Sequence, residues 1–384
     1  MSLESFLEKK PLFYNEIDIQ RFPKIFERYK SLFQLPKIVH IVGTNAKGST
    51  VRALAHMLFK LGLSVGHYSS PHIMKFNERV WLNGRDSTDE ELEKTHNFLV
   101  ENILSDDLNL LSYFEYTTLL AMKLFCEKCE IVVLEAGLGG EFDATNVFPK
   151  ILSIITPIGY DHQSFLGSNI KSIALSKLNS VTNHLVIAKQ KEDIVYKLAF
   201  ERIKKIKKNL YFADSFLDEN SYDELKKYIV ENRFPSFFYD NFSTAISALK
   251  VLGFNEDVKF LDGLNLFGRC QKISPKVTID VGHNPLAAQV IRDCFRDKKV
   301  VLVYNSLDDK DFVSVLKILK PILKRVEILR IDSRRALKLS KLEAALEELE
   351  IEYEFFSKID KREEYLVFGS FITIETFLLD YYEK

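Results

Sequence analysis

The chain has 384 residues, 46% of them hydrophobic, and its 53 basic and 54 acidic residues leave a net charge of −1. This length exceeds what one hydrophobic core usually supports, so we expect two domains. The balanced charge provides no general attraction to nucleic acid or to an anionic membrane surface, and we exclude both as partners.

The first strongly patterned segment lies at residues 38–42, after two short helices expected within residues 1–36. It is an apolar strand, and a glycine-containing turn at 43–50 follows it. The next apolar residues recur at helical spacing up to Gly62, which suits a C-terminal helix cap. A strand, a glycine turn and a helix in this order predict phosphate binding, because amides at a helix start bind anions and Lys47 can add a charge.

The turn departs from the standard P-loop pattern, which requires Gly-Lys-Ser/Thr in that order. Here Lys47 is followed by Gly48, and the two hydroxyl residues Ser49 and Thr50 come after it. Either hydroxyl could bind phosphate or help to hold Mg²⁺. The alternative is a strand–helix turn that binds no ligand.

Apolar strands then alternate with helical segments. Residues 131–134 form a continuous buried strand before a glycine-rich turn, and 151–156 form another that ends at Pro157. Such runs predict a parallel sheet covered on both faces. Residues 190–235 are lysine-rich and less regular, and we interpret the lysines as a solvated helix face.

A second α/β alternation begins after Gly268, following a helical segment at 241–249. Its expected strands are residues 277–280, 300–304 and 366–368. We infer a separate, smaller α/β unit, with the joint near 267–275 and domains at 1–267 and 273–384.

Polar residues follow several of the expected strands in the first domain. Ser70, Glu135 and the pair at 161–162 would meet at the carboxyl edge of the sheet, where ligands bind in doubly wound folds. Beside a phosphate loop they could form a Mg²⁺ shell. Position alone leaves alternatives open: Glu135 could support a helix cap, Ser70 could be a turn residue, and His162 could donate hydrogen bonds instead of binding metal.

The second domain repeats this arrangement at Asp280, which closes a strand before a glycine turn. Asp280 could hold a ribose hydroxyl or a substrate amine, or it could simply cap the next helix. Arg269 lies on the joint between domains and could reach a phosphate, although a surface role is the usual one for arginine.

We expect a cytoplasmic protein, because no apolar run is long enough to cross a bilayer and the first ten residues lack a signal-peptide layout. Cys126 and Cys129 form a CxxC pair with no second pair nearby, and Cys270 and Cys294 are isolated. Zinc or redox work at the CxxC pair is the alternative to four reduced thiols that bind no metal.

The combined motifs resemble the folylpolyglutamate synthase and dihydrofolate synthase family, within the Mur ligase superfamily of ATP-dependent amide-forming ligases. The matching blocks follow the family order: 43–50 (GTNAKGST), 70–79 (SPHIMKFNER), 114–115, 134–146 (LEAGLGGEFDATN), 161–162, 268–269, 280–285 (DVGHNP), 310–311 and 369–370. The resemblance implies an α/β fold. A larger N-terminal P-loop domain of Mur-ligase type would carry a mainly parallel sheet and bind ATP, and a smaller Rossmann-like α/β domain would follow it.

The resemblance also implies roles for individual residues. Nucleotide binding would fall to Gly43, Thr44, Asn45, Lys47, Gly48, Ser49, Thr50, Asn241, Arg269 and Asp280. Ser70 and Glu135 would hold one Mg²⁺ and His162 a second. The substrate-binding residues would be Phe76, Asn77, Arg79, His283 and Ser370. The catalytic residues would be Lys47, His162, Lys177 and His283, and Lys177 matches a lysine that CO₂ carbamylates in this family.

The chain departs from the family pattern at several of these positions. Ala46 replaces a usual glycine, and we expect it to be tolerated only with a negative φ or a shifted loop. Glu141 stands where arginine is common. The residues around Lys177 and before Asn241 also differ from the usual ones.

The resemblance implies an ATP-dependent ligase that adds L-glutamate to dihydropteroate and to folate glutamate tails through an acyl phosphate. The partners would be ATP, L-glutamate, and dihydropteroate or a reduced folate, and the protein would be a monomer. A single-activity folylpolyglutamate synthase and another Mur-type amino-acid ligase are the alternatives within the superfamily. A P-loop kinase, a mechanical NTPase and an inactive nucleotide-binding module are alternatives from other classes.

Overall fold

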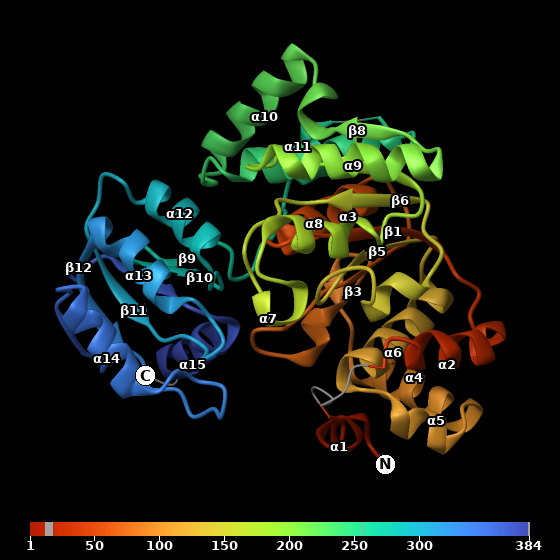
Figure 1. Ribbon diagram of the computed structural model, residues 1–384, viewed down its shortest axis with the longest axis horizontal. Helices are drawn as coiled ribbons and strands as arrows, with labels where there is room; N and C mark the ends of the chain where they lie inside the picture. Colours follow the sequence, from red (N-terminus) through yellow and green to blue (C-terminus); the bar gives the residue numbers. More distant parts are fainter. Residues whose placement is uncertain (12–17, 256, 383–384) are drawn as a thin grey trace. The chain divides into compact units, whose positions relative to one another are not determined.

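The computed structural model describes residues 1–11, 18–255 and 257–382, and the chain divides into two compact units. Unit 1 comprises Met1–Ile158, Lys171–Tyr228 and Tyr239–Leu264, and unit 2 comprises Gly159–Ile170, Ile229–Phe238 and Asn265–Lys384. Each unit has its own sheet (Figure 1). The domain boundary expected near residues 267–275 stays a prediction.

The sheet of unit 1 has eight strands in the order β4-β3-β2-β5-β1-β6-β7-β8. The strands are β1 (Lys37–Val42), β2 (Val65–Tyr68), β3 (Val80–Leu82), β4 (Arg85–Asp86), β5 (Ile131–Glu135), β6 (Leu152–Ile155), β7 (His184–Ile187) and β8 (Leu210–Phe212). All pairings are parallel except those of β2 with β3 and β3 with β4. The mainly parallel sheet expected from the buried strands is confirmed.

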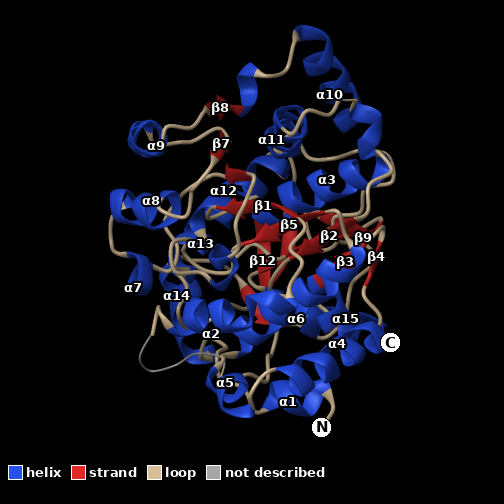
Figure 2. Ribbon diagram, turned by 90° about the vertical axis from the view of Figure 1, so that its right-hand side faces the viewer, coloured by secondary structure: helices blue, strands red, loops and turns tan. Residues whose placement is uncertain are grey.

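Helices cover both faces of this sheet, with α3 and α11 on one face and α4 and α6 on the other (Figures 1 and 2). The helices mainly in unit 1 are α1 (Leu3–Glu8), α2 (Arg21–Tyr29), α3 (Lys47–Lys60), α4 (Asp89–Asn102), α5 (Ser105–Leu110), α6 (Tyr113–Lys128), α8 (Ile170–Leu178), α9 (Asp193–Ile206), α10 (Glu219–Glu231) and α11 (Phe238–Val251). No helix in the described parts of the chain is long and apolar enough to cross a bilayer.

Local sequence explains where these helices begin and end. Ser112 and Glu115 form a capping box at the start of α6, so the first amides of that helix have side-chain acceptors. Gly62 follows α3 with a φ of 88°, a left-handed conformation that glycine adopts without strain. The buried residues of α3 pack on β2 and β5, and this packing fixes the turn that precedes α3.

The lysine-rich segment is more regular than expected, and its lysines lie on a solvated helix face as inferred. Residues 190–235 include α9 and α10, and α9 buries Val195 and Leu198 while its lysines lie on other faces. Lys204 and Lys205 of α9 are exposed, which agrees with an amphipathic helix whose charged face is solvated.

Unit 2 contains a six-stranded sheet in the order β13-β12-β11-β14-β10-β9. Its strands are β9 (Gln271–Ser274), β10 (Val277–Asp280), β11 (Val300–Tyr304), β12 (Leu323–Ile328), β13 (Tyr353–Phe355) and β14 (Tyr365–Phe368), and its helices are α7 (Gln163–Leu166), α12 (Pro285–Cys294), α13 (Phe312–Leu319), α14 (Leu339–Glu348) and α15 (Phe371–Tyr382). All strands are parallel except the edge strand β9. The Rossmann-like α/β unit is confirmed.

Candidate functional site

The turn after β1 passes very close to the strand β6. A Cβ atom on Gly43 would lie 1.8 Å from the Oγ1 of Thr156, so only glycine fits at this position. The amides of Thr44 and Asn45 donate to the carbonyl of Pro157, at 3.0 and 3.2 Å. These bonds hold the turn beside β6. The first amides of α3, from Lys47 onward, have no acceptor within their own helix and are the groups suited to an anion.

Two lysines converge on this turn. The Nζ of Lys47 donates to the carbonyls of Gly43 and Thr44, both at 3.2 Å. The Nζ of Lys177, on α8, donates to the Gly43 carbonyl at 3.0 Å and to that of Gly139 at 3.5 Å. Lys177 is buried, with 4% of its surface exposed. The structure thus brings both predicted catalytic lysines to one carbonyl oxygen.

Ala46 corrects one of our expectations. Its φ is 64°, in the left-handed region, although we expected a negative φ to be needed for alanine. The loop therefore keeps the backbone that suits glycine, and the alanine carries the strain. For an L-residue with a side chain this conformation costs roughly 1–2 kcal/mol.

Replacing Ala46 with glycine is expected to stabilise unit 1 by about 0.5–1 kcal/mol, since part of the relieved strain is offset by the greater freedom of glycine in the unfolded chain. Urea unfolding followed by the fluorescence of Trp81, the only tryptophan, measures this change. The control is Ala55→Gly in the same helix, which should destabilise by about 1 kcal/mol or more. Equal losses in both variants would contradict the assigned strain.

Asn241 also joins the loop within unit 1. Its Nδ2 on α11 donates to the Oγ of Ser49 at 2.9 Å, and this hydroxyl donates to the Ala46 carbonyl at 3.1 Å. The Oγ1 of Thr50 is buried and has no hydrogen-bond partner among the described residues. Of the two hydroxyls considered from sequence, Ser49 is engaged in positioning, and Thr50 has an unsatisfied polar atom.

The predicted ligands of the first metal lie on neighbouring strands. Glu135 is the last residue of β5, and Ser70 follows β2, which pairs with β5 in parallel. Because β1 is the other neighbour of β5, the phosphate turn, Glu135 and Ser70 all lie at carboxyl ends of adjacent strands. A carboxylate and a hydroxyl are the oxygen donors that Mg²⁺ prefers beside phosphate, so these residues fit the metal. No cluster of three or more His, Cys, Asp or Glu side chains suited to a metal occurs in the part of the chain that the structure describes.

The loop at 70–79 is organised by Glu78, which sequence reasoning had placed in the loop without a role. Its carboxylate accepts the amides of Ile73, Met74 and Lys75, each at 2.8 Å. Such a carboxylate fixes three consecutive backbone donors and rigidifies the loop.

The predicted substrate residues lie in the 3₁₀ turn Phe76–Arg79. The guanidinium of Arg79 lies 5.8 Å from the ring centre of Phe76 and 5.3 Å from that of Tyr113, and its Nε donates to the Nδ1 of His72 at 2.7 Å. Burial, with the nearby Arg79 charge, lowers the pKa of His72 to about 4, so His72 stays neutral and accepts this bond. Asn77 binds the carbonyl of Ser87 at 2.9 Å. Of the predicted substrate residues in this turn, Arg79 and Phe76 lie in contact, and the side chain of Asn77 stabilises the loop through its hydrogen bond.

A buried network behind the glycine turn after β5 was missed from the sequence. The Nε2 of His40, on β1, lies 2.8 Å from the Oγ1 of Thr145, which donates to the Oδ1 of Asp143 at 2.5 Å. Asp143 accepts the amide of Leu138 at 2.8 Å through its other oxygen. The network therefore ties the turn that follows Glu135 to the strand that precedes the phosphate loop. The matching block contained Asp143 and Thr145, but only the folded chain brings them to His40.

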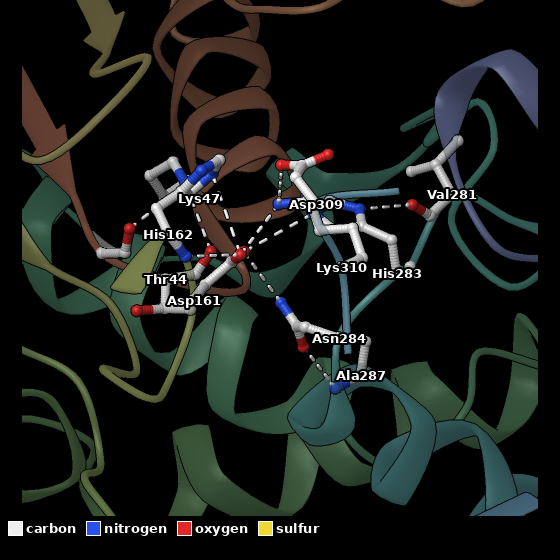
Figure 3. A network of polar contacts seen from close by, with 12 residues as sticks. Thr44, Lys47, Asp161, His162, Val281, His283, Asn284, Ala287, Asp309 and Lys310 are labelled. Atoms are coloured by element: carbon white, nitrogen blue, oxygen red, sulfur yellow. Dashed lines mark hydrogen bonds and ion pairs between the residues drawn. The ribbon is translucent and has the colours of Figure 1, made fainter. Parts of the chain in front are cut away.

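In unit 2, Asp161 is the centre of a polar cluster (Figure 3). Its carboxylate accepts from the Nζ of Lys310 at 2.8 Å and from the Nδ2 of Asn284 at 3.3 Å, and lies 3.5 Å from the Nε2 of His283. His162 has a left-handed backbone, with φ 49°, and its Nε2 is 3.9 Å from Asp161.

Electrostatics keep Asp161 ionised. Burial alone would raise the pKa of Asp161, but the hydrogen bond and charge of His283, with His162 and Lys310, hold it well below the usual range. His162 and His283, which were given site roles from the sequence, thus both lie beside the carboxylate of Asp161, which was given none. The sequence did point to Asp161 and Lys310 as members of the site, because residues 161–162 and 310–311 both belong to the blocks that match the family.

The remaining predicted residues of unit 2 lie at the carboxyl ends of β10 and β14. Asp280 accepts the amides of Cys270 and Gly282, at 2.8 and 2.7 Å, so it fixes both turns beside it. The Arg269 guanidinium lies 5.4 Å from the ring centre of Phe371.

Ser370 is buried and accepts the amide of Thr373 at 3.0 Å, which makes it a helix cap in this structure. Unit 2 contains Asp161, His162, Arg269, Asp280, His283 and Ser370, and unit 1 contains the phosphate loop.

Comparison with known proteins decides the family. The chain is 30% identical over 354 residues to dihydrofolate synthase/folylpolyglutamate synthase of Haemophilus influenzae, covering 83% of this chain and 80% of the relative. This chain belongs to the dihydrofolate synthase/folylpolyglutamate synthase family. It is accordingly an ATP-dependent carboxylate–amine ligase. A scan against protein-family models found no match.

Solved structures of family members agree with the fold. A crystal structure of Helicobacter pylori folylpolyglutamate synthetase matches with a TM-score of 0.79 and 38% identity, over 100% of this chain and 98% of the other. The bifunctional folylpolyglutamate synthase/dihydrofolate synthase of Yersinia pestis, complexed with AMPPNP and Mn, matches with a TM-score of 0.83 over 99% and 98% at 24% identity, which supports the fold alone.

Proposed function

We propose that this ligase is bifunctional: it joins L-glutamate to dihydropteroate and also extends the glutamate tail of reduced folates. The grouping of the phosphate turn, Glu135 and Ser70 at the carboxyl ends of β1, β5 and β2 supports the ligase chemistry, and the relative from Haemophilus influenzae, which is named for both activities, supports the two acceptors. A ligase of this kind needs ATP phosphates and a metal ligand set next to an acceptor site, and the loop with Arg79 and Phe76 begins directly after Ser70.

The reaction overcomes the poor reactivity of a carboxylate toward an amine. The acceptor carboxylate attacks the γ-phosphorus of ATP and gives an acyl phosphate and ADP. The glutamate amine then attacks the acyl carbon, and the tetrahedral intermediate collapses to an amide and phosphate. Lys47 and the first amides of α3 would stabilise the negative charge that gathers on the transferred phosphoryl oxygens.

We further propose that Ser70 and Glu135 hold one Mg²⁺ and that His162 contributes to a second site. A bound divalent cation would neutralise phosphate charge during the transfer. The AMPPNP and Mn in the Yersinia pestis structure support a nucleotide with a divalent cation in this family. Carbamylation of Lys177 would place a negative group near Gly43 and Gly139, where its amine now donates to carbonyls.

Arg79 and Phe76 would contact the acceptor, and His283 and Ser370 would contact the incoming glutamate. Asn241, Arg269 and Asp280 would contact the nucleotide. The protein would act as a cytoplasmic monomer.

A two-acceptor assay tests this function. Purified protein is incubated with ATP, Mg²⁺, L-glutamate and either dihydropteroate or tetrahydrofolate, and ADP and product mass are followed. We expect glutamate-dependent ADP release with both acceptors and a product heavier by one glutamyl residue in each case. Turnover with tetrahydrofolate alone would show that the enzyme has a single activity and would contradict bifunctionality. No turnover with either acceptor would contradict the whole proposal.

A further inference from the structure

The C-terminal end of α8 packs closely against the glycine turn that follows β5. A Cβ atom on Gly140 would lie 3.1 Å from the Cα of Lys177, so the two backbones are nearly in contact. Lys177 lies in the last turn of α8, and its Nζ donates to the carbonyls of Gly43 and Gly139. The direction of the Lys177 side chain therefore depends on how the end of α8 is held against the turn.

Glu141 directly follows the glycine turn and binds this end of α8 twice. Its amide donates to the carbonyl of Ser176 at 2.9 Å, and its carboxylate accepts from the Nδ2 of Asn179 at 2.8 Å. The Nδ2 of Asn146 donates to the Glu141 carbonyl at 2.8 Å and fixes the backbone of the turn. Three hydrogen bonds thus hold Glu141, and two of them bind residues on either side of Lys177.

The charge of Glu141 does not suit this place by itself. The last carbonyls of a helix carry partial negative charge, so a carboxylate beside them is unfavourable and a cation is favourable. Arg202 of α9 supplies the cation, because its guanidinium donates to the carbonyls of Asn179 and Val181 at 2.9 and 2.8 Å. With this cation at the helix end, the Glu141 carboxylate can serve as the acceptor for the Asn179 side chain.

Both partners of this side-chain bond lie where the chain departs from the family pattern. Glu141 stands where arginine is common, and Asn179 belongs to the differing segment around Lys177. An arginine at position 141 could not accept from the Asn179 amide, because a guanidinium has no acceptor atom. The two departures thus meet in the folded chain, and the carboxylate of one is the acceptor for the amide of the other.

We propose that Glu141 and Asn179 are positioning residues for Lys177. Their hydrogen bond fixes the end of α8, and this holds the Lys177 amine at the Gly43 carbonyl beside the phosphate turn. Without the bond, the last turn of α8 opens more often and exposes the amine to solvent. The proposal deepens the catalytic role proposed for Lys177 and rests on that role only for its effect on the reaction.

The chemical reactivity of the Lys177 amine measures how firmly it is held. The full-length protein is treated with a limiting amount of acetic anhydride, in buffer purged of CO₂ so that the amine stays unmodified. Unfolding in excess deuterated anhydride then labels the remaining amines, and mass spectrometry of peptides gives the rate at each lysine. We expect Glu141→Ala to raise the rate at Lys177 about tenfold, the usual value of one hydrogen bond to a charged group. The rate at Lys123, a buried lysine of α6, should stay within about twofold.

Variants that exchange the partners separate this bond from a general loss of stability. Glu141→Gln keeps an acceptor oxygen for Asn179 and should keep the wild-type rate at Lys177. Asn179→Asp places two carboxylates together and should raise that rate. Adding Glu141→Gln to Asn179→Asp restores a donor and an acceptor and should bring the rate back. Glu201→Ala, at an exposed position of α9, is the matched control and should leave the rate unchanged.

The proposal is overturned if Glu141→Ala leaves the rate at Lys177 unchanged or raises the rate at Lys123 equally. It is also overturned if the double variant is as reactive as Asn179→Asp alone. These outcomes do not depend on ligase activity, so they are independent of the proposed function.

Steady-state kinetics test the consequence for the reaction. If Lys177 is catalytic, Glu141→Ala should lower kcat about tenfold and keep the KM for L-glutamate within about twofold, and Glu141→Gln should recover most of the loss. An exposed Lys177 with an unchanged kcat would support the positioning and contradict the catalytic role proposed for Lys177. The failure of either proposal is thus distinguishable from that of the other.

Discussion

Replacing Asp161 with asparagine is expected to lower the free energy of unfolding of unit 2 by about 3 kcal/mol. The asparagine would leave the ammonium of Lys310, 5% exposed, without the carboxylate that it contacts at 2.8 Å. Hydrogen exchange of β10 and β14 peptides in increasing urea measures the stability of unit 2, and Trp81 fluorescence monitors unit 1 separately.

The pH dependence of this loss has a definite sign. The folded state depresses the pKa of Asp161, so its contribution is complete above the unfolded value of about 4 and declines as the pH falls below it. The difference between wild type and Asp161→Asn should therefore be full at pH 7 and shrink in acid.

A surface aspartate provides the control for this substitution. Asp293 is about half exposed and pairs with Arg292 and Arg296 at the surface, so Asp293→Asn should change stability by less than about 0.5 kcal/mol. If Asp161→Asn behaved like this control, Asp161 would not be the centre of the unit 2 cluster.

Replacing Lys47 with alanine is expected to lower kcat for glutamate-dependent ADP release by about 10²–10³-fold, the usual effect of removing one group that stabilises transition-state charge. Lys47 begins α3, and its ammonium lies beside the carbonyls of Gly43 and Thr44. Steady-state kinetics with saturating ATP measure the loss, and Trp81 fluorescence checks that unit 1 stays folded.

Lys60→Ala, at the exposed end of the same helix, is the matched control and should keep kcat within about twofold. A kcat for Lys47→Ala that stays within a few-fold of wild type would remove Lys47 from the phosphate site.

The parts of the fold with strong local signals were predictable from sequence. The strand β1, its glycine turn and α3 carry a mainly apolar run, a turn residue and a helical period, so each local preference agrees with the fold. The short antiparallel strands β3, β4 and β9 were not foreseen. Their place at the sheet edges depends on tertiary pairing.

Much of the candidate site could be anticipated only as separate motifs. Asp161, His283 and Lys310 lie on three segments of unit 2, and nothing in their spacing says that one carboxylate joins them. The left-handed Ala46 was also unforeseen, since the chain keeps the glycine-type loop although it lacks the glycine.

The most direct test of the central claim follows an oxygen atom. Dihydropteroate labelled with ¹⁸O in its carboxylate is supplied with ATP, Mg²⁺ and L-glutamate, and the released phosphate is analysed by mass spectrometry. If the acceptor carboxylate attacks the γ-phosphorus, each phosphate that accompanies amide formation carries one ¹⁸O atom from the acceptor. Amide formation with unlabelled phosphate would show that the carboxylate is activated in another way, and the account would fail.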